Sequence, residues 1–171
     1  MTAMKNKLLL PIKISVLLLL FLTRCSNKES LQTELSNSEK DDIKKEIIQI
    51  VDNYFESVKS NDIEEILIFW SNSDDFIHAG DGSIFGGYKE WSSYLREWTN
   101  PDRKWLYWNN KDIHVIVIDR IAASYTMNFE NAFIEKGDTI KVKGSWTYVF
   151  RKENSEWKVV ASNGMHKGFT Y

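Results

Sequence analysis

Residues 146–160 read WTYVFRKENSEWKVV, which is the pattern of a β-hairpin. Aromatic and β-branched residues, which favour extended backbone, stand on both sides of the polar turn Glu153-Asn-Ser155. The sequence therefore predicts a strand over 139–151 and a second strand over 156–163 that returns beside it.

Strand patterns continue upstream of this hairpin as far as Pro101. Lys136-Gly-Asp138 provides the turn of a second hairpin, whose first strand is expected over 121–134. Apolar and polar residues alternate in that strand, which predicts one buried face. Its apolar members are Ala123, Tyr125, Met127 and Phe129. A further strand is expected over 104–118, with a bulge at Asn109-Asn110.

Helical spacing marks the segment before these strands. A capping box at Ser38-Glu-Lys-Asp41 is expected to begin a helix that runs to about Ser60. The apolar residues of its inner face are Ile43, Ile47, Ile50, Val51, Tyr54 and Val58. Asn61-Asp62 then caps a second, shorter helix that includes Trp70.

A short strand and a third helix complete the predicted order. The strand covers 75–78 and is followed by the turn Gly80-Asp-Gly82, while the helix covers 88–98 and stops at Asn100-Pro101. The chain is therefore expected to form an α+β domain that ends in a meander of long antiparallel strands.

Two segments carry a family resemblance. Tyr54-Phe-Glu-Ser-Val-Lys-Ser-Asn-Asp62, followed by Ile66-Leu-Ile-Phe-Trp70, resembles the opening of nuclear transport factor 2-like (NTF2-like) domains, and 146–160 resembles their last hairpin, especially in the SnoaL-like branch. The resemblance covers 38–166. It implies a cone in which a curved antiparallel sheet wraps around three N-terminal helices, with a pocket at the open end. It implies no single reaction, because this fold hosts isomerases, cyclases, dehydratases, hydrolases and binding modules.

The N-terminus has the pattern of an export signal. A basic start precedes the apolar run 14–22, which is too short for a spanning helix of about 20 apolar residues. Leu22-Thr-Arg-Cys25 resembles the lipobox of bacterial lipoproteins, in which the cysteine is lipidated. Arg24 departs from that pattern, which has a small residue there, so an uncleaved membrane anchor stays open as the alternative.

The predicted organisation is a signal peptide over 1–24, a lipidated cysteine and polar tether over 25–37, and one SnoaL-like domain over 38–171. The expected location is the bacterial cell envelope, outside the cytoplasm and lipid-anchored to a membrane. Since Cys25 is the only cysteine, the domain has no disulfide, zinc–thiolate site or cysteine nucleophile.

Charge argues against a nucleic-acid partner. The chain has 22 basic and 24 acidic residues, and four of the basic ones precede Cys25, which leaves 18 against 24. The remainder also lacks a basic run.

Aromatic residues are the main candidates for a ligand pocket. The sequence holds seven Trp, seven Tyr and nine Phe, and such side chains line cavities as well as cores. The residues expected at the wall or rim of the pocket are Trp70, Trp91, Trp98, Trp146 and His166.

Two further residues are candidates for acid–base chemistry. In the ketosteroid-isomerase branch, a tyrosine on the first helix donates to the oxyanion and an aspartate on the first strand is the base. The resemblance places Tyr54 at the first position and His78 at the second, where histidine suits proton transfer near neutral pH. The second oxyanion donor of that branch is missing, because 139–150 contains no Asp or Glu. A hydrogen-bonded structural role for His78 stays open.

Metal and cofactor binding are not expected. His78, His114 and His166 fall on or beside separate predicted strands, without a short ligand spacing such as His-x-His. His114 is interpreted as a surface or interface position.

Three functional hypotheses remain. The favoured one is a membrane-tethered pocket that binds a small apolar or aromatic ligand. The alternative is a cofactor-free isomerase, dehydratase or hydrolase that uses His78 and Tyr54. The third is a structural homodimer that pairs through the sheet face.

Overall fold

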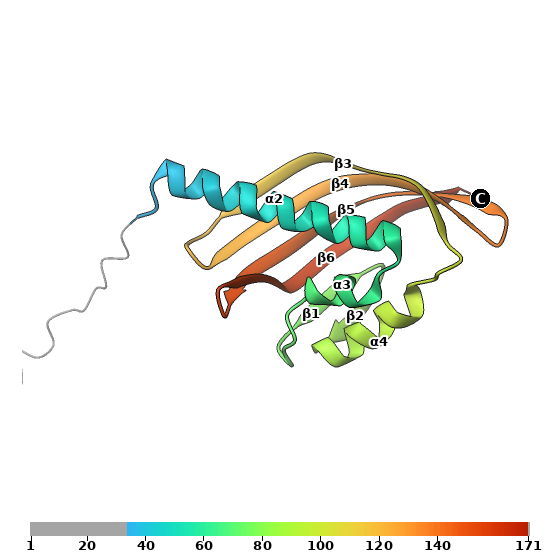
Figure 1. Ribbon diagram of the computed structural model, residues 1–171, viewed down its shortest axis with the longest axis horizontal. Coiled ribbons are helices and arrows are strands. Elements are labelled where there is room, and N and C mark those ends of the chain that lie inside the picture. The colour runs from blue at the N-terminus through green and yellow to red at the C-terminus, as the bar shows by residue number, and fades with distance from the viewer. Residues whose placement is uncertain (1–33, 171) are drawn as a thin grey trace, which may run out of the picture. The chain divides into compact units, whose positions relative to one another are not determined.

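The computed structural model describes residues 34–170, apart from the side chains of 168–170. The predicted signal peptide, Cys25 and tether residues 26–33 lie outside the described residues. The elements in chain order are α2 (Asn37–Ser60), α3 (Ile63–Ile68), β1 (Ile77–Gly80), β2 (Ser83–Gly86), α4 (Tyr88–Trp98), β3 (Lys104–Val117), β4 (Ala122–Glu135), β5 (Asp138–Glu153) and β6 (Glu156–Thr170) (Figure 1). The expected α+β order is confirmed.

One curved sheet holds all of these strands, in the order β2-β1-β6-β5-β4-β3. The four long strands form the predicted antiparallel meander. β1, however, runs parallel to β6, with Ile77 opposite Ala161 and Gly80 opposite Gly164, so the sheet is mixed instead of wholly antiparallel. No hairpin joins β1 to β6, and therefore no turn imposes an antiparallel direction on this pair.

α2 and α4 end where the sequence predicts, but α2 begins earlier. α3 ends at Ile68 and does not include Trp70, which instead forms an isolated parallel bridge with Val159. Ser36, not Ser38, caps α2: its Oγ accepts from the Glu39 backbone N at 3.2 Å, and the Glu39 carboxylate accepts from the Ser36 backbone N at 2.8 Å. The same Ser-x-x-acid spacing occurs at both serines, so spacing alone did not distinguish them. Asp62 caps α3, as predicted.

Four details of the strands differ from expectation. β1 covers Ile77–Gly80 instead of 75–78. β2 was not predicted, because four residues after a turn give too short an alternation to recognise. The register shifts of β3 fall at Trp105/Tyr107 and Lys111/His114 instead of Asn109-Asn110. β6 continues to Thr170, so His166 lies inside a strand and not just past it.

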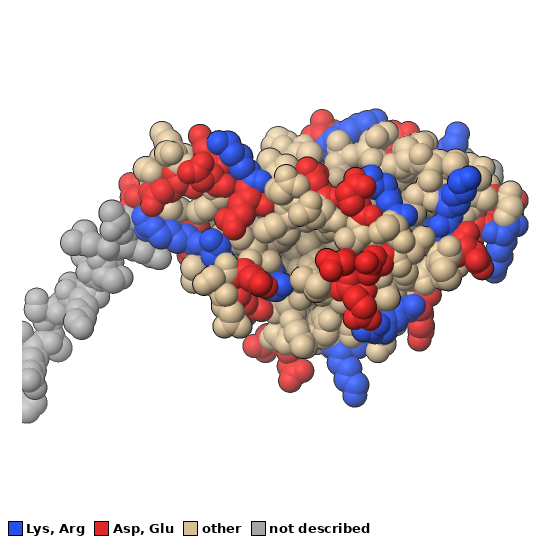
Figure 2. All heavy atoms as spheres, in the orientation of Figure 1, with Lys and Arg blue, Asp and Glu red and all other residues tan. Residues whose placement is uncertain are grey.

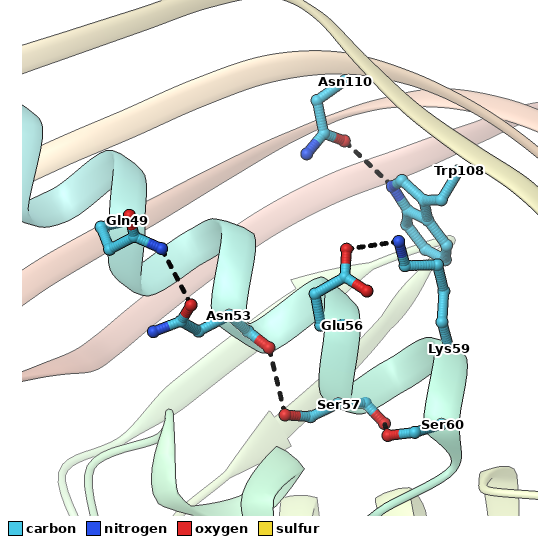
Figure 3. A network of polar contacts seen from close by, with 8 residues as sticks. All are labelled: Gln49, Asn53, Glu56, Ser57, Lys59, Ser60, Trp108 and Asn110. Atoms are coloured by element: carbon cyan, nitrogen blue, oxygen red, sulfur yellow. Dashed lines mark hydrogen bonds and ion pairs between the residues drawn. The ribbon is translucent and has the colours of Figure 1, made fainter.

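The core lies between the helices and the inner face of the sheet. α2 buries Ile47, Val51, Phe55 and Val58, and the alternating residues of β4 are buried as predicted. The outer side of α2 is polar. Gln49 donates to Asn53 at 2.9 Å, and Lys59 pairs with Glu56 (Figure 3).

Figure 2 shows acidic and basic side chains interspersed over the helix-bearing side, without a patch of one sign. Among the described residues, no helix is long and apolar enough to cross a membrane.

Candidate functional site

A cavity of about 190 Å³ lies between α2, α4 and the inner face of the sheet. It brings together every side chain that the sequence suggested for the pocket. These side chains are Tyr54, Trp70, His78, Trp91, Trp98, Trp146 and His166. His114, in contrast, is exposed on β3 and does not line the cavity.

His78 is held in an aromatic sandwich on one wall. Its ring stacks on Trp91 at 4.0 Å between centroids and on Trp146 at 5.3 Å, with interplanar angles of 19° in both cases. Its Nδ1 lies 2.7 Å from the Ser162 hydroxyl. Because β1 and β6 run parallel with His78 opposite Ser162, the sheet register itself brings these two groups together.

Burial sets the protonation of His78. The side chain is buried, and this desolvation lowers its pKa to about 4; the Asp81 carboxylate acts in the opposite direction, and His166 adds to the lowering. His78 is therefore a neutral imidazole at neutral pH. A neutral imidazole can donate one hydrogen bond and accept another, but with this pKa it is a weak base.

Tyr54 enters the cavity from α2 and is packed among other rings. It stacks on Phe69 at 4.0 Å and meets the edge of Trp70 at 5.7 Å, and Trp70 in turn contacts Trp91, the ring beneath His78. Burial raises the pKa of Tyr54 well above its ordinary value. The phenol thus keeps its proton and is available as a hydrogen-bond donor.

An aspartate–histidine pair, absent from the sequence prediction, lies at the same cavity. Asp81, in the turn between β1 and β2, accepts from the His166 backbone N at 2.8 Å through Oδ1, and its Oδ2 contacts His166 Nδ1. Burial acts to raise the pKa of Asp81, but the two hydrogen bonds from His166, together with the electrostatic effect of the His166 and His78 rings, outweigh it and hold the pKa below its ordinary value. The carboxylate is therefore ionised at neutral pH.

Nothing local in the sequence marks this pair. Asp81 stands between two glycines and was interpreted only as the centre of a turn, where Asp is common for conformational reasons. Its backbone φ of 50° fits that role. The partner histidine is 85 residues away, and only the pairing of β1 with β6 brings the two together.

Glycines allow the close packing on which this site depends. Trp146 on β5 lies opposite Gly164 on β6, and a Cβ at Gly164 would come within 2.2 Å of the indole. A Cβ at Gly80 would lie 3.1 Å from Nε2 of His78. No larger residue fits at Gly164 without moving Trp146, the ring that also stacks on His78.

The lining is apolar and nearly uncharged. Asp81 is the only carboxylate among the lining residues, and no Lys or Arg is present in that set.

The indole N–H of Trp108 donates to Asn110 at 2.9 Å (Figure 3). Within the described part of the chain, the buried indole N–H groups of Trp70, Trp91 and Trp146 have no hydrogen-bond partner. The described residues also include no cluster of three or more His, Cys, Asp or Glu arranged to hold a metal ion.

These features define an NTF2-like α+β domain, with a curved sheet closed by helices over an aromatic pocket. A family model for the SnoaL-like domain matches residues 47–164, and the chain belongs to that family. A search of curated proteins found no match.

Solved structures share the fold at low sequence identity. A protein proposed to be a scytalone dehydratase from Novosphingobium aromaticivorans has a TM-score of 0.68 and 11% identity, covering 79% of this chain and 91% of that chain. A type 2 hexachlorocyclohexane dehydrochlorinase has a TM-score of 0.63 and 13% identity, covering 79% and 92%. A ketosteroid isomerase-like protein from Erwinia carotovora atroseptica has a TM-score of 0.58 and 13% identity, covering 71% and 94%.

Proposed function

We propose that this chain binds a small, neutral, largely aromatic molecule in the cavity between α2, α4 and the sheet. The observation that carries the proposal is the lining itself, which is built mainly of aromatic rings and contains neither Lys nor Arg. Such a wall offers stacking and edge contacts, while nothing in it neutralises a phosphate or carboxylate.

The size of the cavity narrows the ligand class. An apolar cavity of roughly 150 Å³ holds benzene. The volume here is about 190 Å³, which suits one substituted ring or a small fused pair of rings. The phenol of Tyr54 and the imidazole of His78 then supply a few polar contacts that orient the ligand.

The proposal includes a membrane tether. A basic, apolar N-terminus that ends at Cys25 supports export and lipid attachment, which would place the pocket at the surface of a membrane in the bacterial envelope. Apolar ligands concentrate at such a surface, so the tether and the pocket chemistry agree.

A matched pair of rim variants tests the binding function. Ser83 lines the cavity from β2, whereas its neighbour Ile84 is 70% exposed and is not part of the lining. Equilibrium dialysis of phenol, indole and 1-naphthol should show saturable binding of at least one compound to wild type. Ser83→Trp should weaken that binding at least tenfold, and Ile84→Trp should leave it unchanged. Equal effects of the two variants would contradict the proposal.

Acid–base catalysis is the second candidate function, as a cofactor-free isomerase, dehydratase or hydrolase. It is favoured by the position of His78 and Tyr54 on one cavity. Tyr54 would donate to an oxygen on which charge develops. The low pKa of His78, about 4, fits a neutral hydrogen-bonding group better than a strong base.

A further inference from the structure

We infer that His166, oriented by Asp81, accepts a proton from the molecule bound in the cavity. The inference rests on the proposed binding function and goes beyond it, because it adds a chemical step. His166 would be the catalytic residue, and Asp81 would be a positioning residue.

The geometry of the pair supports this role. Both Asp81 and His166 line the cavity, and Asp81 holds His166 through the backbone N at 2.8 Å and through ring atom Nδ1. A carboxylate at Nδ1 keeps the proton on that nitrogen, so that the basic lone pair is on Nε2. The same arrangement fixes the tautomer of the histidine in Ser-His-Asp hydrolases.

The surroundings favour His166 over His78 as the proton acceptor. His78 is only 4% exposed and is enclosed by Trp91 and Trp146, whereas the His166 side chain is 29% exposed. A proton accepted by His166 therefore has a path to bulk water. Trp146 is close to both histidines, with its centroid 5.3 Å from His78 and 5.5 Å from His166, so the two imidazoles line the same part of the cavity.

The chemistry requires no cofactor. The substrate class is a neutral aromatic molecule with an acidic C–H next to a bond that can break. His166 removes the proton, the C–H electron pair forms a new π-bond, and the bond to the leaving group breaks with its electrons going to that group. The proton then passes from His166 to water. The Tyr54 phenol donates a hydrogen bond to the departing atom.

The probe 5-nitro-1,2-benzisoxazole tests this step. Removal of its C3 proton turns the C–H pair into a nitrile bond, and the N–O bond breaks to give a coloured phenolate. Wild type should accelerate this reaction with saturation. His166→Gln should lower kcat by about 10²–10⁴-fold, the usual range for a general base. Asp81→Asn should lower kcat with KM unchanged, which a merely structural role would not produce.

Controls separate the inference from the binding proposal. His114→Gln changes an exposed histidine outside the cavity and should leave the rate unchanged. Thermal melting checks that each variant is folded, and added imidazole should restore activity to a folded His166→Gly variant. If the probe quenches tryptophan fluorescence saturably but wild type reacts no faster than His166→Gln, the proton-transfer step is overturned and the binding proposal stands. Absence of saturable quenching would overturn the binding proposal for this ligand class, and the inference with it.

Discussion

The indole of Trp146 lies flat against Gly164, its partner on the neighbouring strand, in a space that has no room for a Cβ. The same indole stacks on the ring of His78, with 5.3 Å between the ring centroids. The absence of a side chain at Gly164 therefore allows Trp146 to occupy the position in which it contacts both His78 and His166.

Gly164→Ala should disturb the pocket as well as the fold. The new methyl would overlap the Trp146 ring, and overpacking of this kind costs about 1–3 kcal/mol. We expect a lower free energy of unfolding in urea and weaker binding of the aromatic probes. Gly86→Ala is the matched control, because a Cβ there meets nothing within 4 Å. A Gly164→Ala variant as stable as Gly86→Ala would show that Trp146 is not confined by β6.

Ser36 and Ser38 provide a direct test of where α2 begins. Ser36 caps the helix through the Glu39 backbone N, so Ser36→Ala should lower the free energy of unfolding by about 0.5–2 kcal/mol. Ser38→Ala falls inside the first turn and should cost little, since alanine is a good helix former. Chemical denaturation of both variants gives the comparison. If Ser38→Ala lowered the free energy of unfolding more than Ser36→Ala, Ser38 would be the N-cap of α2.

Stability should depend on pH through His78. Its pKa in the folded state, about 4, lies below the ordinary value of 6.5, so the unfolded chain binds the proton more readily. The contribution of neutral His78 to the free energy of unfolding is complete above about pH 6.5. It falls by about 2 kcal/mol at pH 5 and by about 3 kcal/mol at pH 4. Urea denaturation at pH 7 and pH 5 should show a larger loss in wild type than in His78→Gln. Equal losses would mean that His78 titrates normally.

Cys25 should carry the membrane anchor. Because a basic start, an apolar run and this cysteine occur in order, the wild-type protein should incorporate labelled fatty acid and sediment with membranes. Cys25→Ala should lose the label. Arg24→Gly restores a small residue before the cysteine and should increase cleavage of the signal segment. Unmodified full-length wild-type protein in the cytosol would contradict the prediction.

The sequence was most informative where one pattern determines one contact. Alternation in β4 identified its buried face, because a strand has only two faces. The large aromatics of the pocket were found for a similar reason, since side chains of that size on inward-facing positions must line a core or a cavity. Trp91 and Trp146 are of this kind.

The sequence was least informative where a contact depends on strand pairing across a long separation. The parallel direction of β1 beside β6 follows from no turn, and the four residues of β2 are too few to show a period. Asp81 has the ordinary composition of a turn, and its role depends on His166, which was placed beyond a strand that in fact contains it. These contacts require the assembled sheet.

The parallel pairing of β1 with β6 also determines the stage of folding at which the site can form. Both histidine contacts, His78 with Ser162 and Asp81 with His166, join residues 84 and 85 positions apart. Because β6 is the last of the described strands, neither contact can form until residues 156–170 have joined the sheet. The His78 and Asp81–His166 part of the pocket is therefore completed only by contacts between residues far apart in the sequence, which form slowly.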